Sequence, residues 1–265
     1  MLCLSACNKD DNTTSGGSAG FKSVKMSVQM SGETHFAEEY TPSFSDGKLT
    51  GMLEKTWNST GWTPDGKPTG LVQSSERTYK ISWNEGSKKL GGTVSEKFLN
   101  EDSGKLEAGE THSIDGSFDA NHNILSLKGM YNEESFQYNS NKQISKMTMG
   151  TYSYDFTWEN GNMVRCTSSG GSALIFMYGD EDNTFPANAN LVMGLVVESE
   201  PLAVFGHCGP ATKKLPVGYI QDFVSSSIEY AITYEKDNSG RIVKMTSKMA
   251  QGDEYAHVRV LEIKY

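Results

Sequence analysis

The chain has few basic residues for its length, and they are not grouped. Among 265 residues there are only four arginines, and the formal net charge is −9 at pH 7 with an isoelectric point near 5.1. Proteins that bind nucleic acid neutralise its phosphates with clustered lysine and arginine side chains. The acidic balance therefore excludes a nucleic-acid partner, and it gives no support for a binding site on an anionic membrane surface.

The sequence also lacks the motifs of common catalytic and cofactor sites. It contains no GxSxG, P-loop or dinucleotide-binding fingerprint. Its five histidines show no HxxxH spacing and accompany no paired cysteines, so no zinc site is predicted. No acidic pair stands out as the two carboxylates of a glycosidase. We predict no catalytic residue, no cofactor and no metal, and we expect a protein that is not an enzyme.

One acidic run comes nearest to a metal site. Residues 180–184, with the sequence DEDNT, place oxygen atoms at alternate positions, as the start of a calcium-binding loop does. Such a loop then needs glycine at its sixth position and glutamate at its twelfth, where this chain has Phe185 and Leu191. The run is therefore interpreted as a solvated turn.

Cysteine is scarce, and the position of one cysteine is informative. Leu4-Ser5-Ala6-Cys7 resembles the bacterial lipobox, which implies cleavage before Cys7 and a lipid on its sulfur. Each buried methylene of an attached chain adds about 0.8 kcal/mol of membrane affinity. Only six residues precede Cys7, whereas an export signal needs a basic start and an apolar run of roughly 7–15 residues. We therefore expect the start of the precursor to lie further upstream.

Residues 1–20 are predicted to comprise this truncated signal, the lipobox and a disordered tether rich in Gly, Ser and Asp. Lys9-Asp10-Asp11 resembles the short acidic signal that sends Bacteroidetes lipoproteins to the outer face of the outer membrane. The alternative is ordinary solvated charge in a linker. The resemblance implies a lipid-anchored outer-membrane protein that faces the cell surface, with the periplasmic face as the alternative, and it makes the lipid the only membrane contact.

With Cys7 lipidated and Cys3 removed, Cys166 and Cys208 remain. An even pair in an oxidising compartment is permitted to form a disulfide. Two separate buried thiols are the alternative, because free cysteine is among the most buried residue types.

The body of the chain has few long apolar segments and a repeat of twenty residues. Three series of residues keep this step: Phe136, Phe156 and Phe176; Phe98, Phe118, Tyr138, Trp158 and Tyr178; and Ile124, Ile144 and Val164. Each unit alternates aromatic and polar residues, passes through a turn such as NSNKQ, and returns with an apolar segment. Two short strands and two turns add up to about twenty residues, so the unit is interpreted as a β-hairpin with one buried face.

The predicted fold class is all-β, a single domain over residues 21–265. We expect roughly a dozen strands in a large antiparallel meander, and a sheet of that size curls into a rolled sheet or partial barrel. Strand 173–178 is apolar on both faces and therefore requires a second layer. Residues 187–220 are interpreted as an insertion packed on the sheet, with a short helix that includes Leu191 and Leu195, followed by a Gly/Pro-rich connection.

The lipobox, the hairpin repeats and the KKLP-type loop before the last hairpin together resemble an uncharacterised family of Bacteroidetes outer-membrane lipoproteins. That family has a porin-like β fold and no assigned activity. The resemblance covers residues 110–265 best and implies the fold alone.

Two tryptophans are the candidate ligand-binding residues. Trp62 lies in NSTGWTPDGKPTG, a loop rich in Gly, Pro and Asp that is difficult to bury, so it is a candidate for ligand or partner contact. Its alternative role is packing against the sheet. Trp57 ends a predicted strand in phase with Leu49 and Leu53, which favours the core over a ligand site.

The leading functional hypothesis is a surface-exposed, non-enzymatic binding module with a glycan as ligand. The second hypothesis is a structural or adhesive envelope component that binds a protein partner. A glycoside hydrolase is third, and would need two facing carboxylates in a cleft. A membrane-spanning barrel is not expected, because the second face of the strands is Ser, Asp, Thr, Gln and Lys rather than apolar.

Overall fold

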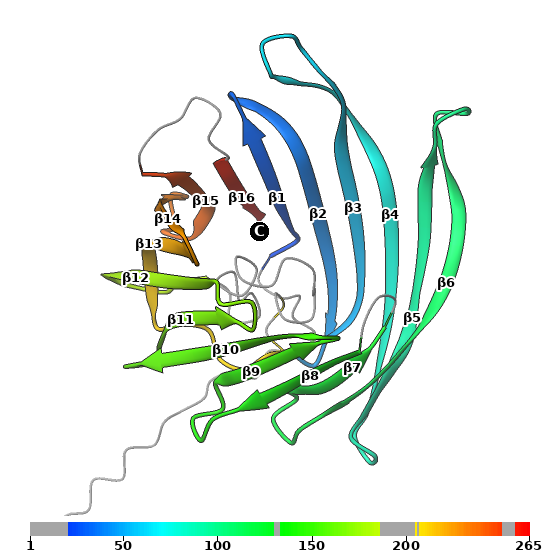
Figure 1. Cartoon of the computed structure of the whole chain (residues 1–265). Coiled ribbons are helices and arrows are strands. Elements are labelled where there is room, and N and C mark those ends of the chain that lie inside the picture. Colours follow the sequence, from blue (N-terminus) through cyan, green and yellow to red (C-terminus); the bar gives the residue numbers. More distant parts are fainter. Residues whose placement is uncertain (1–20, 130–132, 186–204, 206, 251–257) are drawn as a thin grey trace, which may run out of the picture.

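Sixteen antiparallel strands close into a barrel in the computed structural model of the chain (Figure 1). The structure describes residues 21–129, 133–185, 205, 207–250 and 258–265. The strands are β1 (Ser23–Met30), β2 (Glu33–Ser45), β3 (Lys48–Trp62), β4 (Pro68–Asn84), β5 (Lys89–Asn100), β6 (Lys105–Phe118), β7 (Ile124–Lys128), β8 (Glu133–Tyr138), β9 (Ile144–Met149), β10 (Tyr152–Glu159), β11 (Asn162–Ser168), β12 (Ala173–Asp182), β13 (Lys214–Phe223), β14 (Ser226–Lys236), β15 (Ile242–Met249) and β16 (Val258–Lys264).

The antiparallel meander is confirmed, and its closure corrects the expected partial barrel. Each strand pairs with its neighbours in the chain, and β1 pairs with β16 from Ser23 opposite Lys264 to Gln29 opposite Val258. Closing the ring removes the open edge between the first and the last strand. Because this pairing joins opposite ends of the chain, no local sequence pattern predicts it.

The barrel has two unlike ends. At the near end β1 begins and β16 ends, and the turns at 46–47, 85–88, 119–123, 139–143 and 160–161 lie there. At the far rim the hairpins β3–β4 and β5–β6 rise beyond the other strands (Figure 1). Strands β2–β6 have 12 to 17 residues, whereas β7–β11 have 5 to 8. One side of the wall is therefore taller than the other.

Most side chains on the inward face of the wall are apolar, as the alternation predicted. In β10, Phe156 is buried and Tyr154 and Trp158 pack against the core, while Asp155 and Thr157 point outward and are exposed. Fully burying a large apolar side chain stabilises a fold by about 1.5–3 kcal/mol. The period of two along each strand thus places one row of side chains in a continuous core inside the barrel.

A ring of aromatic side chains accounts for the twenty-residue repeat. Each side chain donates a hydrogen bond of 2.6 to 3.0 Å to a backbone carbonyl. The accepting residue is one of the first three of a strand that begins at the near end. Every accepting residue lies at a register shift, where a β-bulge disrupts the ladder. The indole or phenol thus supplies the donor that the buried carbonyl needs. The pairs are Trp83 with Leu49, Tyr138 with Ile124, Trp158 with Ile144, Tyr178 with Met163, Tyr234 with Pro216, and Tyr265 with Ile242.

In the repeat series that contains Phe118, one member lies outside the core. Phe98 keeps the spacing of twenty from Phe118, but it lies near the far rim in β5 and is 44% exposed. Phe118 is buried against Trp83, with ring centroids 4.9 Å apart. The extension of the series back to Phe98 was wrong because β5 and β6 are longer than the repeat requires.

The predicted insertion over residues 187–220 is shorter than expected, because Lys214–Phe223 form wall strand β13. Pro216 is accommodated at a register shift opposite Tyr178, where a missing ladder donor is tolerated. The helix predicted around Leu191 lies outside the described residues. The described part of the chain contains strands and turns only, with no helix long and apolar enough to cross a membrane.

The strand with two apolar faces is β12. Phe176 points inward and is buried, while Ile175 and Met177 on its other face are half-buried. The described residues put no second layer over this outer face, and Phe205 and residues 207–212 lie at the near end of the barrel instead.

Candidate functional site

Phe205 and residues 207–212 lie across the near end of the barrel and are here called the floor. Phe205 is 1% exposed and sits among the rings of Phe21, Tyr40 and Phe44 at 6.0 to 6.3 Å, on the side of β1 and β2. Gly209 lies on another side of the barrel, against the backbone of the β8–β9 turn. The floor therefore spans the interior between two parts of the wall.

Gly209 is required by this close approach. Its φ is +88°, and a Cβ there would lie 2.5 Å from the carbonyl oxygen of Lys142. Only glycine adopts this backbone conformation without strain and leaves room for the neighbouring chain.

His207 ties the floor to two strands. Its Nε2 accepts the Leu49 N–H at 3.1 Å, its backbone carbonyl accepts the Ile124 N–H at 2.8 Å, and its ring contacts Trp83 at 4.8 Å. Burial lowers the pKa of His207 to about 4, because the charged imidazolium loses its hydration. The ring is therefore a neutral acceptor at ordinary pH.

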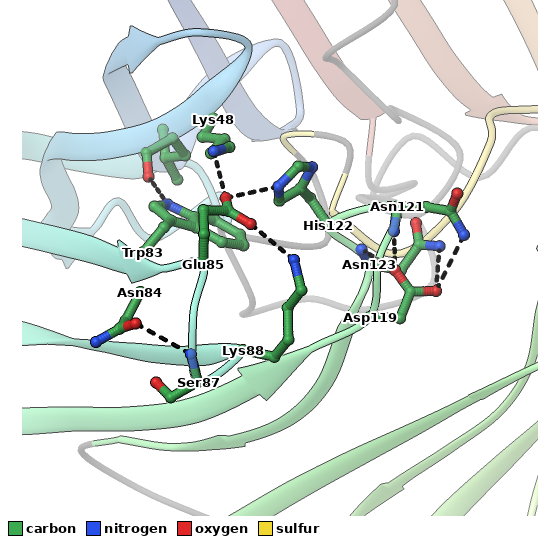
Figure 2. A network of polar contacts seen from close by, with 11 residues as sticks. Lys48, Trp83, Asn84, Glu85, Ser87, Lys88, Asp119, Asn121, His122 and Asn123 are labelled. Carbon is green, nitrogen blue, oxygen red and sulfur yellow. Dashed lines mark hydrogen bonds and ion pairs between the residues drawn. The ribbon is translucent and has the colours of Figure 1, made fainter.

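Glu85 joins three turns at the near end. Figure 2 shows its carboxylate between Lys48, Lys88 and His122, with contacts of 2.5, 2.8 and 2.7 Å. These donors lower the pKa of Glu85 to about 2, with Lys48 as the largest cause. Lys48 is the first residue of β3 and His122 lies in the β6–β7 turn, so the carboxylate links neighbouring hairpins at the near end.

The turns themselves repeat one device. In Figure 2 the Asp119 carboxylate accepts the backbone N–H groups of Asn121 and Asn123 at 2.8 and 2.9 Å. Asn139 makes the same pair of bonds in the β8–β9 turn, and Asp237 does so in the β14–β15 turn. These side chains satisfy turn amides and fix each hairpin.

A charged cluster lies on the inner face of the tall wall, and sequence reasoning missed it. Arg77 donates to Glu96 at 2.6 Å and to Glu54 at 2.9 Å, and Tyr79 donates to Glu54 at 2.8 Å. The side chains of Glu54 and Glu96 are 5% and 6% exposed. His112 Nε2 lies 3.8 Å from Glu96. We call these five residues the inner cluster.

Tyr40 extends the inner cluster toward β2 and donates to Glu38 at 2.8 Å. Burial, followed by the negative charges of Glu38 and Glu54, raises the pKa of Tyr40 well above its ordinary value. The phenol therefore stays protonated and acts as a donor. One sequence signal could have revealed the cluster. Arg77 alternates along β4 with Tyr79, Ile81 and Trp83 and therefore lies on the same inward face as these apolar and aromatic residues.

The outer face of the wall carries charges of alternating sign in register. Adjacent strands from β14 round to β5 each contribute one residue, and successive residues are direct cross-strand partners. Opposite charges in such positions attract. Ion pairs form at 2.7 Å in two of these steps, Glu235 with Lys244 and Glu76 with Lys97. This outer ladder consists of Glu235, Lys244, Glu262, Lys25, Glu39, Lys55, Glu76 and Lys97.

Trp62 is the last residue of β3, at the far rim, and its side chain is 50% exposed. Its ring lies 4.9 Å from the ring of His35, whose Nδ1 is 2.7 Å from the Ser59 hydroxyl. An indole face that remains open to solvent beside a second ring is a stacking surface for a ligand.

Trp57 lies elsewhere, and the assignment to the core was wrong. A register shift at Phe44 and Leu49 moves the later part of β3 out of phase with Leu49, so Trp57 points outward in the middle of the strand. Lys25 lies over its ring at 5.7 Å. Trp57 and Trp62 therefore do not form one site.

Cys166 and Cys208 are two separate buried thiols that form no disulfide in the structure, which is the second of the two alternatives. Burial raises the pKa of Cys166 to about 12, so its thiol stays protonated and unreactive. Cys7, the candidate for lipidation, lies outside the described residues.

Two acidic side chains in the run at residues 180–184 form ion pairs with lysines. Lys214 donates to the Asp182 carboxylate at 2.8 Å, and Lys236 pairs with Glu181. Within the described ranges no three His, Cys, Asp or Glu side chains approach closely enough to hold a metal ion.

A groove of about 330 Å³ lies where the tall wall meets the short wall. It is lined by residues of β5, β6, β7 and β8: Lys89, Leu90, Asp115, Gly116, Ser126, Leu127, Lys128 and Glu133. Its charges are mixed, with two lysines and two acids.

Comparison with solved structures identifies the architecture. The chain superposes on the crystal structure of a porin-like protein from Bacteroides uniformis with a TM-score of 0.55, covering 92% of this chain and 97% of that one at 17% sequence identity. The shared feature is the porin-like β-barrel fold. At this identity the likeness carries the fold and not the activity. No protein-family description matches the sequence. No curated protein matches it either.

Proposed function

We propose that the protein is a lipid-anchored lipoprotein of the bacterial outer membrane whose barrel stands in water and acts as a non-enzymatic binding module. The observation that carries this proposal is the outer ladder of charges. The likeness of fold to a Bacteroides protein and the lipobox-like sequence at Cys7 support the location and membership of the Bacteroidetes lipoprotein family described above.

The outer ladder argues against a lipid-facing wall. A membrane-spanning barrel needs an outward apolar band about 25 Å tall, and a lysine or arginine at the bilayer midplane costs about 2–4 kcal/mol. Here lysines and glutamates follow one another across half of the strands. The lipid on Cys7 would therefore be the membrane attachment.

From the position of Phe21 we infer that the near end faces the membrane. Phe21 and the floor belong to the near end, and the fourteen residues from Cys7 to Phe21 reach at most about 50 Å when fully extended. The far rim then points away from the membrane. Trp62 lies at the far end of a strand of 15 residues, roughly 45 Å along its length from Lys48.

Non-enzymatic binding is supported by the inner cluster. Both of its carboxylates already accept hydrogen bonds from Arg77 or Tyr79, so the protein's own donors occupy them. A glycan is the proposed ligand at the far rim, because the exposed face of Trp62 can cover the apolar face of a sugar ring.

Screening the full chain, with Cys7→Ser to prevent lipidation, on a polysaccharide array tests this proposal. Trp62→Ala should lose the retained glycans, while Tyr152→Ala, which removes an aromatic side chain that is 61% exposed on the short wall, should keep them. Equal binding by wild type and Trp62→Ala, or no glycan retained by either, would contradict the proposed ligand.

A further inference from the structure

Within the part of the barrel that the structure describes, β6 has a long stretch with a free edge. β7 pairs with only the last part of β6, from Asp115 opposite Lys128 to Phe118 opposite Ile124. From Lys105 to Ile114, β6 pairs with β5 alone among the residues that the structure describes. Figure 1 shows the β5–β6 hairpin standing clear above β7 and β8. We call Lys105–Ile114 the β6 edge.

An edge strand offers main-chain hydrogen bonds to another chain. Every second residue of such a strand directs both its N–H and its C=O away from its own sheet. A bulge interrupts the β6 edge once, where the register shifts between Ser95 and Lys97 on β5. The remaining stretches on either side of the bulge stay extended, and an added strand can pair with them.

Apart from Lys105, Leu106, His112 and Ile114, the side chains on the β6 edge are small or acidic. Ala108, Gly109, Thr111 and Ser113 leave room for the side chains of an incoming strand. Glu107, Glu110 and the adjoining Asp115 are exposed, and the side chain of Glu110 is 86% exposed. Lys105, at the hairpin tip, is the only lysine or arginine of the edge.

This charge selects the kind of partner. A second copy of the chain would bring one acidic edge against another, which is unfavourable for directly opposed residues. A strand that carries lysine or arginine meets complementary charge along the same edge. The groove of about 330 Å³ at the foot of the edge, lined by Asp115, Lys128 and Glu133, offers further polar contacts to the end of that strand.

We propose that the β6 edge binds an extended, basic segment of another protein by strand addition. The site lies apart from Trp62 and needs neither the lipid nor a glycan, so it goes beyond the function proposed above. The barrel would then bind a protein partner at the β6 edge and a ligand at the far rim.

Titration with a designed peptide tests the proposal. The probes are a nine-residue peptide that alternates valine and lysine, the same peptide with glutamate in place of lysine, and the lysine peptide with alternate amides N-methylated. The full chain with Cys7→Ser should bind the lysine peptide at least tenfold more tightly than either of the others. Equal binding of the glutamate peptide would overturn the charge argument, and equal binding of the N-methylated peptide would overturn strand addition.

Two further readouts locate the site. Hydrogen exchange of the backbone amides in Lys105–Ile114 should slow on addition of the lysine peptide; protection confined to other strands contradicts the proposal. Glu110→Lys should weaken binding by about twofold to fivefold, as expected for one exposed charge pair, whereas Glu229→Lys on the doubly paired strand β14 should not. Protection of the β6 edge that rises with protein concentration alone would instead identify a second copy as the occupant.

Discussion

Protonation of His207 should release the floor and lower the stability of the barrel in acid. In the folded protein the neutral ring accepts the Leu49 N–H and its pKa is about 4, compared with about 6.5 in an unfolded chain. Between about pH 4 and 6.5 the imidazole of His207 is therefore protonated in the unfolded state and neutral in the folded state. This stability is fully present above about pH 6.5 and is lost as the pH falls through 4.

The size of this effect follows from the two pKa values. Protonation of His207 should lower the free energy of unfolding by about 2 kcal/mol between pH 7 and pH 4.5. Each pH unit between the unfolded and the folded pKa contributes about 1.4 kcal/mol. Urea unfolding at the two pH values should show this loss in the wild type, on top of the contribution of the carboxylates. In His207→Gln, whose amide oxygen can still accept a hydrogen bond but does not titrate, the loss should be smaller by about that amount.

His35→Gln at the far rim is the matched control, and it should leave the acid-dependent loss as it is in the wild type. If His207→Gln and the wild type lose the same stability between pH 7 and pH 4.5, then His207 is not a buried neutral acceptor and the account of the floor fails.

Three other substitutions test the inside of the barrel by the same urea measurement at pH 7. Trp158→Phe removes the donor to a buried bulge carbonyl and should cost about 1–3 kcal/mol, whereas Trp57→Phe on the outer wall should cost less; equal costs would contradict the aromatic ring. Arg77→Met leaves two buried carboxylates without their cation and should cost about 3–5 kcal/mol; a neutral effect would show that the inner cluster is not buried. Gly209→Ala should destabilise the protein more than Gly240→Ala. Both glycines have positive φ, but only a Cβ at position 209 would lie 2.5 Å from a backbone carbonyl oxygen. The reverse order would contradict the placement of the floor against the β8–β9 turn.

The local parts of the fold could be predicted from sequence because they depend on neighbouring residues. The alternation of Tyr154, Phe156 and Trp158 fixes which face of β10 is buried. The turn sequences at Asp119, Asn139 and Asp237 place a side-chain acceptor at the first position of a hairpin loop. Both features act within a single repeat unit.

The parts that failed depend on bulges and on distant pairing. One bulge beside Leu49 reverses the phase of β3, and it turned Trp57 from an apparent core residue into an outer one. Pro216 resembled a loop residue because a proline lacks the ladder donor, and only the register shift in β12 explains its place in a strand. The strand number and the closure between β1 and β16 follow from pairings that no single segment contains.

The inner cluster escaped sequence reasoning for a similar reason. Glu54, Arg77 and Glu96 are far apart in the chain and become neighbours only through the registers of β3 with β4 and of β4 with β5. The available signal was a charged residue in each strand at a position that alternates with the buried core residues. The floor gave no periodic signal, because its contacts are single hydrogen bonds and ring contacts to the ends of strands.

The central claim is that the barrel stands in water on its lipid, with the near end toward the membrane. Single labels on Asp46→Cys in the β2–β3 turn and on Asp65→Cys in the β3–β4 hairpin can report this, because the native thiols of Cys166 and Cys208 are only 3% and 1% exposed. With the lipidated full chain on vesicles that contain an acceptor-labelled lipid, energy transfer should be strong from position 46 and weak from position 65. Equal transfer from the two positions, or stronger transfer from position 65, would contradict the account.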